Sequence, residues 1–259
     1  MQVNRYWKNI FLPRGGQYLK TIIAPKEWIH DEVQRDGRKI ALSYWEAKQS
    51  SKSVVILVHP YRKEAKDYFF SSPHAFMYHE MGYHVVVFDV NGFGESDDLD
   101  FYFDQDIFVV SQYCVDRWKP HILAGHGISF GGAVLINGLV RNDHHFTKAI
   151  IENCLDHASS YYRKRNSSLY ILSLFIFRLV PQAHRFFTYY KRIKEIIRPD
   201  PVLLLYCKDD ELTTIEMGHR LKENMRVGSE FIVMNGGHME AIVKDAEKYK
   251  EAIKNYLNR

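Results

Sequence analysis

The sequence predicts an α/β fold in which a mostly parallel sheet is covered by helices on both faces. Three observations support this prediction. From about residue 30 onward, short apolar runs alternate with helix-compatible segments, which is typical of strands joined by crossover helices. Two alternating runs flank Asp36-Gly37, which favours an antiparallel hairpin at the start of the sheet. The segment 155–200 separates two strands and is too long for a single crossover helix, so we expect it to be a helical cap inserted into a core formed by residues 1–154 and 201–259.

The remaining elements follow in order along the chain. Continuous apolar runs predict strands that are buried on both faces, at residues 53–59, 84–89, 121–125, 148–154, 202–207 and 231–234. A short helix is predicted to begin at Pro73, with Ser72 as its N-cap and Gly82 as its stop signal. Longer helices are predicted at residues 101–119, 130–141 and 240–257.

Composition and terminal patterns narrow the class of protein. Hydrophobic residues make up 46% of the 259 residues, which is ample for a core. Three widely spaced cysteines (Cys114, Cys154 and Cys207) form no CxxC pair, which favours a reducing compartment and no structural zinc. The first twenty residues lack the apolar core of a signal peptide, and the longest apolar run, 169–180, is too short to span a bilayer. We therefore expect a cytoplasmic protein.

Ser129 is the candidate nucleophile. It lies in the stretch Gly-His-Gly-Ile-Ser-Phe-Gly-Gly (125–132), after a predicted strand and before a predicted helix, which is the context of a nucleophile elbow. Such a sharp turn leaves little room for side chains two residues away, and Gly127 and Gly131 meet that requirement. The backbone N–H of Phe130 would face an oxyanion at the start of the helix.

Two further groups follow predicted strands, at the edge where open parallel sheets bind their ligands. The loop that begins at His59 would supply a second oxyanion donor, the backbone N–H of Tyr61, since Pro60 has no N–H. His238 follows the last predicted strand and two glycines, and it would accept the proton of the serine as a general base.

An acid that orients this histidine is expected just past the strand 202–207. Three carboxylates compete for this role, namely Asp209, Asp210 and Glu211. Asp210 is favoured because it lies three residues beyond the strand end, and Asp156, after the preceding strand, is a weaker rival. The candidates then occur in the order serine, aspartate, histidine along the chain.

On these residues the chain resembles the α/β-hydrolase superfamily, from the hairpin to the C-terminus. The stretch Asp-Val-Asn-Gly-Phe-Gly-Glu-Ser (89–96) matches the D-x-x-G-x-G-x-S loop of that superfamily. The loop after His59 is similar to the H-G-x-R oxyanion loop of its lipase-, esterase- and serine aminopeptidase-like branches, apart from Pro60. The resemblance implies an eight-stranded sheet, a catalytic triad, no cofactor, and a cap that shapes substrate choice.

We therefore expect a serine hydrolase that cleaves a carboxylic ester or a related acyl bond of a small hydrophobic substrate through an acyl-enzyme intermediate. An aminopeptidase or an acyltransferase would use the same triad. The alternative from another class is a non-catalytic binding protein whose site is blocked by Pro60 or by the cap.

The predicted cap carries nine Lys or Arg against three Asp or Glu, together with nine Tyr or Phe. The aromatic residues either pack on the core while the cations are solvated, or form an acyl pocket whose basic rim attracts anionic lipid or a membrane surface. Nucleic-acid binding is not expected, because no nucleic-acid-binding fold signature accompanies the charge.

Other motifs have structural interpretations. Asp89 is expected to organise its loop rather than to catalyse. The Gly-Phe-Gly of this loop is not a dinucleotide fingerprint, since Asp97 stands where a third glycine is required. His79 and His84 imitate a zinc-protease motif, but they are five residues apart and do not share a helix face, so no metal is expected.

Overall fold

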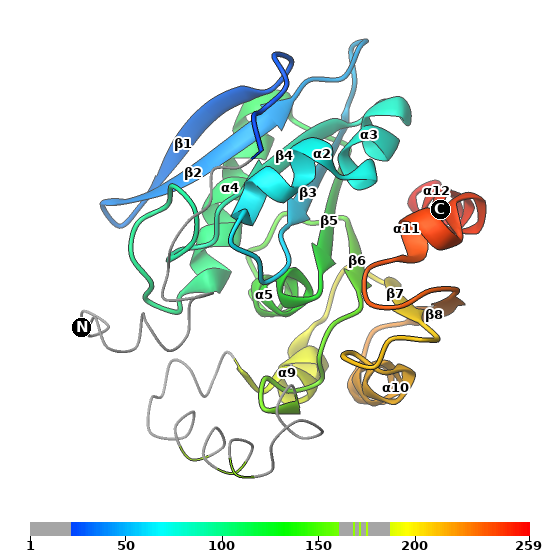
Figure 1. Cartoon of the computed structure of the whole chain (residues 1–259). Coiled ribbons are helices and arrows are strands. Elements are labelled where there is room, and N and C mark those ends of the chain that lie inside the picture. Colours follow the sequence, from blue (N-terminus) through cyan, green and yellow to red (C-terminus); the bar gives the residue numbers. More distant parts are fainter. Residues whose placement is uncertain (1–21, 161–167, 169–170, 172–174, 176–186) are drawn as a thin grey trace.

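A computed structural model describes residues 22–160 and 187–259, together with Ser168, Ile171 and Phe175. Its centre is an eight-stranded sheet with the order β1-β2-β4-β3-β5-β6-β7-β8 (Figure 1). The strands are β1 (Ile29–Arg35), β2 (Arg38–Trp45), β3 (Ser53–Val58), β4 (His84–Phe88), β5 (Ile122–Ile128), β6 (Lys148–Glu152), β7 (Val202–Cys207) and β8 (Ser229–Met234). Strands β3 to β8 run parallel, and β2 is antiparallel to both β1 and β4. The predicted fold class, a mostly parallel sheet with an antiparallel hairpin at its N-terminal edge, is confirmed.

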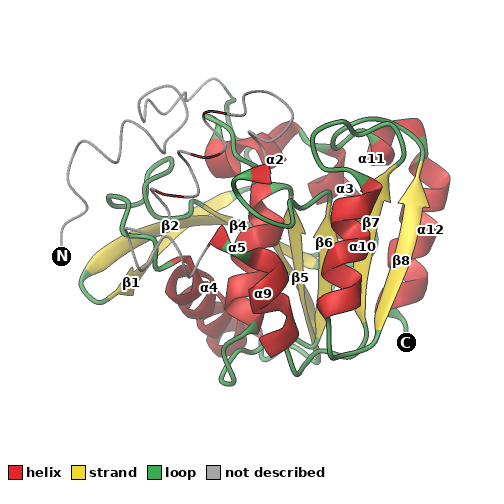
Figure 2. Cartoon of the chain, turned by 90° about the horizontal axis from the view of Figure 1, so that it is seen from below, coloured by secondary structure: helices red, strands yellow, loops and turns green. Residues whose placement is uncertain are grey.

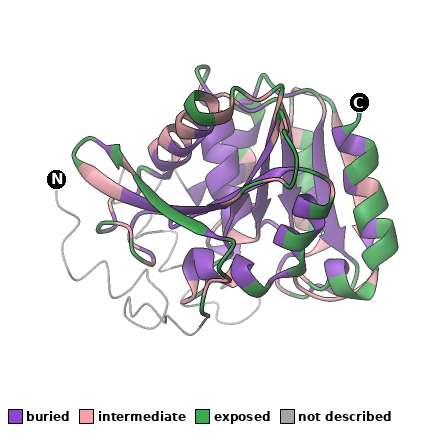
Figure 3. Ribbon diagram, turned by 90° about the horizontal axis from the view of Figure 1, so that it is seen from above, coloured by how far each residue is buried: buried purple, intermediate pink, exposed green. Residues whose placement is uncertain are grey.

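Helices cover both faces of this sheet (Figure 2). One face carries α4 (Phe103–Trp118), α5 (Phe130–Leu139), α9 (Tyr189–Arg192) and α10 (Ile215–Asn224). The other face carries α2 (Tyr68–Ser71), α3 (Pro73–Glu80), α11 (Ala241–Lys244) and α12 (Ala246–Leu257). Two 3₁₀ turns, η2 (Ala65–Asp67) and η3 (Ile193–Glu195), complete the described elements. The central strands are buried between these layers, as expected for parallel strands (Figure 3).

Local chemistry accounts for the turn and the short helix that the sequence predicts. Asp36 and Gly37 both have positive φ (50° and 76°), which is the backbone of a tight hairpin turn between β1 and β2. The Ser72 hydroxyl accepts a hydrogen bond from the backbone N–H of His74 at the start of α3, and Pro73 is the first helical residue.

Strand β5 extends three residues beyond the predicted run 121–125. His126, Gly127 and Ile128 pair with β3, β6 or both, so tertiary pairing outweighs the low strand propensity of glycine. Within the predicted run, Gly125 lies close to α5: a Cβ there would lie 2.7 Å from the end of the Leu135 side chain, which would have to shift.

The single helix predicted at 240–257 is wrong, since the structure has two helices, α11 and α12. The break falls at Asp245, whose backbone is not helical (φ −135°, ψ 39°). Its carboxylate accepts hydrogen bonds from the backbone N–H and the side-chain amide of Asn235, which tie the break to the loop after β8. Helix α10, between β7 and β8, is a helix that the sequence analysis did not predict.

The two described ends of the predicted cap segment lie side by side. The Ala158 N–H donates to the Phe187 carbonyl (3.1 Å), and the Tyr190 N–H donates to the Asp156 carbonyl (3.0 Å). Phe187, Tyr189 and Ile193 pack in the same core as α4 and α5. Residues 161–186, apart from the three named above, lie outside the described residues, so the cap and its boundaries at 155 and 200 stay predictions. In the described part of the chain, no helix is long and apolar enough to cross a bilayer.

Candidate active site

Ser129 lies on a strained turn between β5 and α5. Its φ of 54° and ψ of −113° are unfavourable for a residue with a side chain, and such strain clusters at functional sites. A Cβ on Gly127 would lie 2.3 Å from the Gly131 carbonyl oxygen, and a Cβ on Gly131 would lie 2.0 Å from the Val58 carbonyl oxygen. Both predicted elbow glycines are therefore required by the close approach of α5 to the sheet.

The structure brings the three predicted side chains together. His238 Nε2 lies 3.0 Å from Ser129 Oγ, and His238 Nδ1 lies 2.7 Å from Asp210 Oδ2. With its Nδ1–H donated to the carboxylate, the imidazole leaves Nε2 free to accept the serine hydroxyl proton. The imidazole is 22% exposed, whereas the Asp210 carboxylate is fully buried.

Asp210 is held by several donors. The backbone N–H groups of Leu212 and Thr213 donate to Oδ1, each at 2.8 Å. The Thr213 hydroxyl and the Asn153 amide donate to Oδ2, the latter at 2.8 Å. Burial raises the pKa of Asp210, but the hydrogen bond and charge of His238 and the bonds from Thr213 outweigh burial, so the pKa lies below its ordinary value. The carboxylate is therefore ionised at neutral pH.

The rival carboxylates lie elsewhere. Asp209 and Glu211 are exposed, and no hydrogen bond joins either to His238 in the part of the chain that is described. Asp156 is bound to Arg220 of α10 (2.9 Å) and to the Ser160 hydroxyl (2.6 Å). Among the four predicted candidates, Asp210 is thus the one that contacts the histidine.

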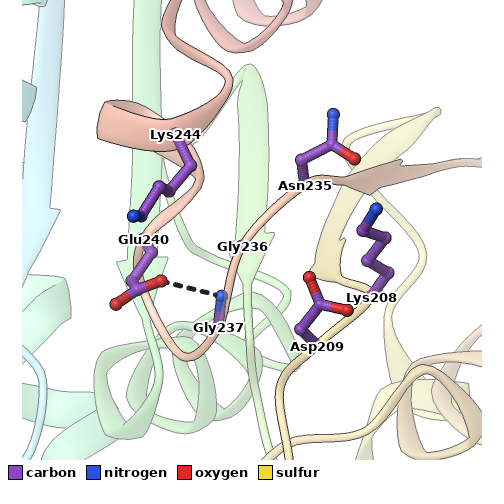
Figure 4. A pocket seen from close by; sticks show the side chains of 7 residues that line it. All are labelled: Lys208, Asp209, Asn235, Gly236, Gly237, Glu240 and Lys244. Carbon is purple, nitrogen blue, oxygen red and sulfur yellow. Dashed lines mark hydrogen bonds between the residues drawn. The ribbon is translucent and has the colours of Figure 1, made fainter.

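Asp209 instead lines a surface pocket of about 620 Å³ on the loops after β7 and β8 (Figure 4). The lining residues are Lys208, Asp209, Asn235, Gly236, Gly237, Glu240 and Lys244. In this pocket the Glu240 carboxylate accepts the N–H of Gly237, which immediately precedes His238. Ser129 does not line this pocket, so the pocket does not contain the candidate nucleophile.

The loop after β3 brings Tyr61 beside Phe130. Their ring centroids are 5.8 Å apart, and both rings lie within 6 Å of Phe93. We call Tyr61, Phe93 and Phe130 the aromatic wall. His59 is buried below it, donating from Nδ1 to the Pro60 carbonyl (2.9 Å) and accepting the Val90 N–H at Nε2 (3.2 Å). Burial lowers the pKa of His59 to about 4, so the ring is neutral and fixes the conformation of the loop.

Asp89 organises the neighbouring loop, as expected. Its carboxylate accepts the backbone N–H groups of Lys66 and Glu95 and the ammonium of Lys66, each at 2.9 Å. A Cβ on Gly94 would lie 2.1 Å from Asp89 Oδ2, which explains the second glycine of the motif. The Ser96 hydroxyl donates to the Asp89 carbonyl (2.6 Å), which closes the loop.

Three residues in this region escaped the sequence analysis, namely Asn153, Thr213 and Lys66. Asn153 falls inside the strand predicted at 148–154, but β6 ends at Glu152, so its place at the ligand-binding edge of the sheet becomes apparent only from the observed end of the strand. The partners of Thr213 and Lys66 become apparent only when the loops are folded against each other.

The two histidines that imitate a zinc-protease motif stack on different tryptophans. His79 stacks on Trp45, with ring centroids 3.7 Å apart, and His84 stacks on Trp118. Within residues 22–160 and 187–259, no group of three or more His, Cys, Asp or Glu side chains is arranged to hold a metal ion.

No family model matches this sequence, and none of the curated proteins does. Several solved structures match it. It is similar to the esterase Pf2001 of Pyrococcus furiosus, at 19% identity over 94% of this chain and 98% of that chain, with a TM-score of 0.72. It is similar to the α/β hydrolase GrgF of Penicillium sp. sh18, at 17% identity over 90% of this chain and 98% of that chain, with a TM-score of 0.67. A bacterial membrane phospholipase A matches at 16% identity over 90% of this chain and 86% of that chain, with a TM-score of 0.63. The chain therefore has the α/β-hydrolase fold.

Proposed function

We propose that the protein is a serine hydrolase that cleaves a carboxylic ester or a related acyl bond. The observation that carries this proposal is the hydrogen-bonded series Asp210–His238–Ser129, with distances of 2.7 and 3.0 Å, on a strained strand-to-helix turn. A buried carboxylate, an imidazole and a serine hydroxyl in this order form the arrangement that activates serine for attack on a carbonyl carbon.

In the proposed mechanism, His238 Nε2 takes the hydroxyl proton as Ser129 Oγ bonds to the carbonyl carbon of the substrate. The Asp210 carboxylate stabilises the imidazolium that forms. The backbone N–H groups of Tyr61 and Phe130 hold the oxyanion of the tetrahedral intermediate. The imidazolium then gives its proton to the leaving alkoxide, and an acyl group remains on Ser129. Water, deprotonated by His238, releases the acid and restores the serine.

The aromatic wall supports a hydrophobic acyl group as part of the substrate. Tyr61 is exposed and Phe130 is half-buried, whereas Phe101, Phe103 and Phe187 are buried behind Phe130 in a series of edge contacts with centroids 5.7 to 6.0 Å apart. Apolar carbons of an acyl chain would be removed from water against the accessible rings of Tyr61 and Phe130, at about 0.8 kcal/mol per buried methylene. The structural likeness to an esterase and to a membrane phospholipase A is consistent with this class of substrate.

Contact of the basic, aromatic cap with anionic lipid remains a proposal, because most of the basic residues that motivate it lie outside the described residues. A vesicle-binding measurement at two salt concentrations tests it, since electrostatic attraction to an anionic surface weakens as salt screens it.

The proposed function is tested by intact-mass measurement after reaction with a fluorophosphonate. We expect one adduct on the wild type and none on Ser129→Ala. Ser159→Ala is the matched control, because Ser159 Oγ lies 2.5 Å from His157 Nδ1 and is a second serine beside a histidine. This control should still form the adduct. A folded wild type without an adduct would favour the non-catalytic binding protein.

Turnover of a series of p-nitrophenyl esters, from acetate to octanoate, then tests the acyl group. A strong preference for acetate would contradict a hydrophobic acyl site. Hydrolysis of aminoacyl amides, or transfer to an added alcohol in preference to water, would favour the aminopeptidase or the acyltransferase.

A further inference from the structure

Two consecutive residues at the end of β6 hold opposite ends of the proposed triad. The Glu152 carbonyl accepts the backbone N–H of Ser129 at 2.8 Å. The Asn153 amide donates from Nδ2 to Asp210 Oδ2 at 2.8 Å. His238 bridges Ser129 and Asp210, so this dipeptide contacts both residues between which the imidazole lies.

We propose that Asn153 is a positioning residue that fixes the Asp210 carboxylate relative to Ser129, and so aligns His238 between them. The inference rests on the proposed function, because it concerns the same site. Nothing in the sequence motifs singles out Asn153, and it does not touch the reacting serine.

The residue type fits the position on two counts. The backbone of Asn153 has a φ of 45°, in the left-handed region that asparagine tolerates better than most residues with a side chain. The residue is fully buried, and its own N–H donates to the Leu205 carbonyl of β7 at 2.9 Å. The position therefore requires a short side chain that can donate to a carboxylate from a strained, buried backbone.

The amide is oriented by a second contact. Cys207 Sγ lies 3.3 Å from Asn153 Oδ1. Burial raises the pKa of the Cys207 thiol to about 11, so the thiol is protonated at neutral pH and donates its hydrogen to Oδ1. The Oδ1 atom thus faces the thiol, and Nδ2 faces the carboxylate.

Asn153 differs from Leu212 and Thr213, the other donors to Asp210, in the part of the sheet that it follows. Leu212 and Thr213 belong to the loop that carries Asp210, so they move with it. Asn153 follows β6, which pairs directly with β5 and the turn at Ser129. The ionisable groups that interact with Asp210 include His238, the thiol of Cys207 and the buried phenol of Tyr206, and Asp209 and Glu211 are exposed on the same loop.

Two variants separate the side chain from the backbone. Asn153→Gly keeps the left-handed conformation and removes the donor, and we expect about a tenfold loss in kcat with KM within about twofold. Asn153→Asp keeps the shape but places a carboxyl beside Asp210. Once ionised, it adds a negative charge that favours the imidazolium form of His238, so the acid limb of the pH profile of kcat/KM should move up by on the order of one pH unit.

The control is Asn137→Ala, which removes another buried amide, in α5, that donates to the Ala133 carbonyl at 2.9 Å. It should lower thermal stability without moving the acid limb. If both Asn153 variants keep the wild-type kcat and acid limb while they remain folded, the proposal is wrong.

A readout independent of turnover distinguishes this proposal from the proposed function. At low pH, the Nδ1 proton of His238 that is donated to Asp210 should give a low-field proton NMR signal, assigned by its absence in His238→Gln. The signal should broaden or shift in Asn153→Gly and persist in Asn137→Ala. An unchanged signal in Asn153→Gly would overturn the positioning role, even if the wild type hydrolyses no ester.

Discussion

Lys66 and Asp89 form a buried ion pair that joins the loop after β3 to the loop after β4. Lys66 Nζ lies 2.9 Å from Asp89 Oδ2 and 2.8 Å from Glu95 Oε2, and only 1% of the lysine side chain is exposed. Burial lowers the pKa of Lys66, but the charges and hydrogen bonds of Asp89 and Glu95 outweigh it and raise the pKa above its ordinary value. The ion pairs of Lys66 with Asp89 and Glu95 therefore hold the loop that carries Tyr61 against the loop after β4.

Replacing Lys66 with methionine should therefore be strongly destabilising. The variant keeps the length of the side chain but leaves the Asp89 carboxylate buried without its cation, which costs about 3–5 kcal/mol in the free energy of unfolding. Urea denaturation measures this. The control is Lys250→Met: Lys250 pairs with Glu80 at the surface (3.4 Å, side chains 46% and 64% exposed), so its loss should change stability by less than about 1 kcal/mol. If Lys66→Met and Lys250→Met lowered the free energy of unfolding equally, the buried ion pair would contribute no more to stability than the surface pair.

Replacing Asp210 with asparagine should lower kcat by about three to four orders of magnitude, because an amide cannot hold the imidazole in the tautomer that accepts the serine proton. Asp209→Asn is the matched control, since Asp209 is adjacent, exposed and directed into the pocket of Figure 4. Turnover of a p-nitrophenyl ester, or the rate of fluorophosphonate labelling, measures both. A loss in Asp209→Asn that matches the loss in Asp210→Asn would contradict the proposed acid.

Tyr61→Ala separates the backbone of residue 61 from its ring. The proposed oxyanion N–H is retained, so turnover of acetyl esters should change little, whereas kcat/KM for longer acyl esters should fall about tenfold as apolar contact is lost. Tyr102→Ala is the control, because this ring has the same 42% exposure and the aromatic wall does not include it. A uniform loss across all acyl lengths would indicate that the ring supports the loop rather than the substrate.

The buried, neutral His59 predicts an acid-dependent loss of stability. Its pKa is about 4 in the fold against an ordinary value of 6.5, so between these pH values the unfolded chain binds a proton that the folded chain does not. The contribution of neutral His59 is fully present above pH 6.5, falls as the pH drops towards 4, and changes no further below that. The total loss is about 3 kcal/mol.

Denaturation curves of the wild type and of His59→Asn from pH 7 to pH 4 test this expectation. The difference in unfolding free energy between them should shrink as the pH falls. The exposed His121, replaced in the same way, should leave the slope of the wild type unchanged. A constant difference between wild type and His59→Asn would mean that His59 takes up its proton equally in both states.

The sheet could be predicted from the sequence where burial on both faces leaves a continuous apolar run. Strand β7 matches its prediction residue for residue for that reason. The end of β5 could not be predicted in this way, since Gly127 suggests a turn until the neighbouring strands and α5 are in place. The break between α11 and α12 involves the hydrogen bonds of Asp245 with Asn235, ten residues earlier in the chain. This contact does not change the hydrophobic pattern of the segment, so the pattern could not predict it.

In the site too, features that depend on local sequence could be predicted, and features that depend on distant contacts could not. Ser129 and His238 could be found because Ser129 directly follows a strand, His238 lies in the loop after the last strand, and each carries a reactive group. Choosing Asp210 among its neighbours used only the distance from the strand end, and the structure gives the physical reason, which is burial against Asn153 and Thr213. Asn153 contacts a residue 57 positions away and Lys66 one 23 positions away, so neither contact could be predicted from local spacing.

The chain leaves the core after β6 and rejoins it before β7 through two adjacent backbone segments, joined by the Ala158–Phe187 and Tyr190–Asp156 hydrogen bonds. Because both junctions lie at one place, the polypeptide between them can be lengthened, shortened or exchanged without pulling β6 and β7 apart. A different segment grafted between Ser160 and Phe187 should therefore leave Ser129, Asp210 and His238 at their present distances.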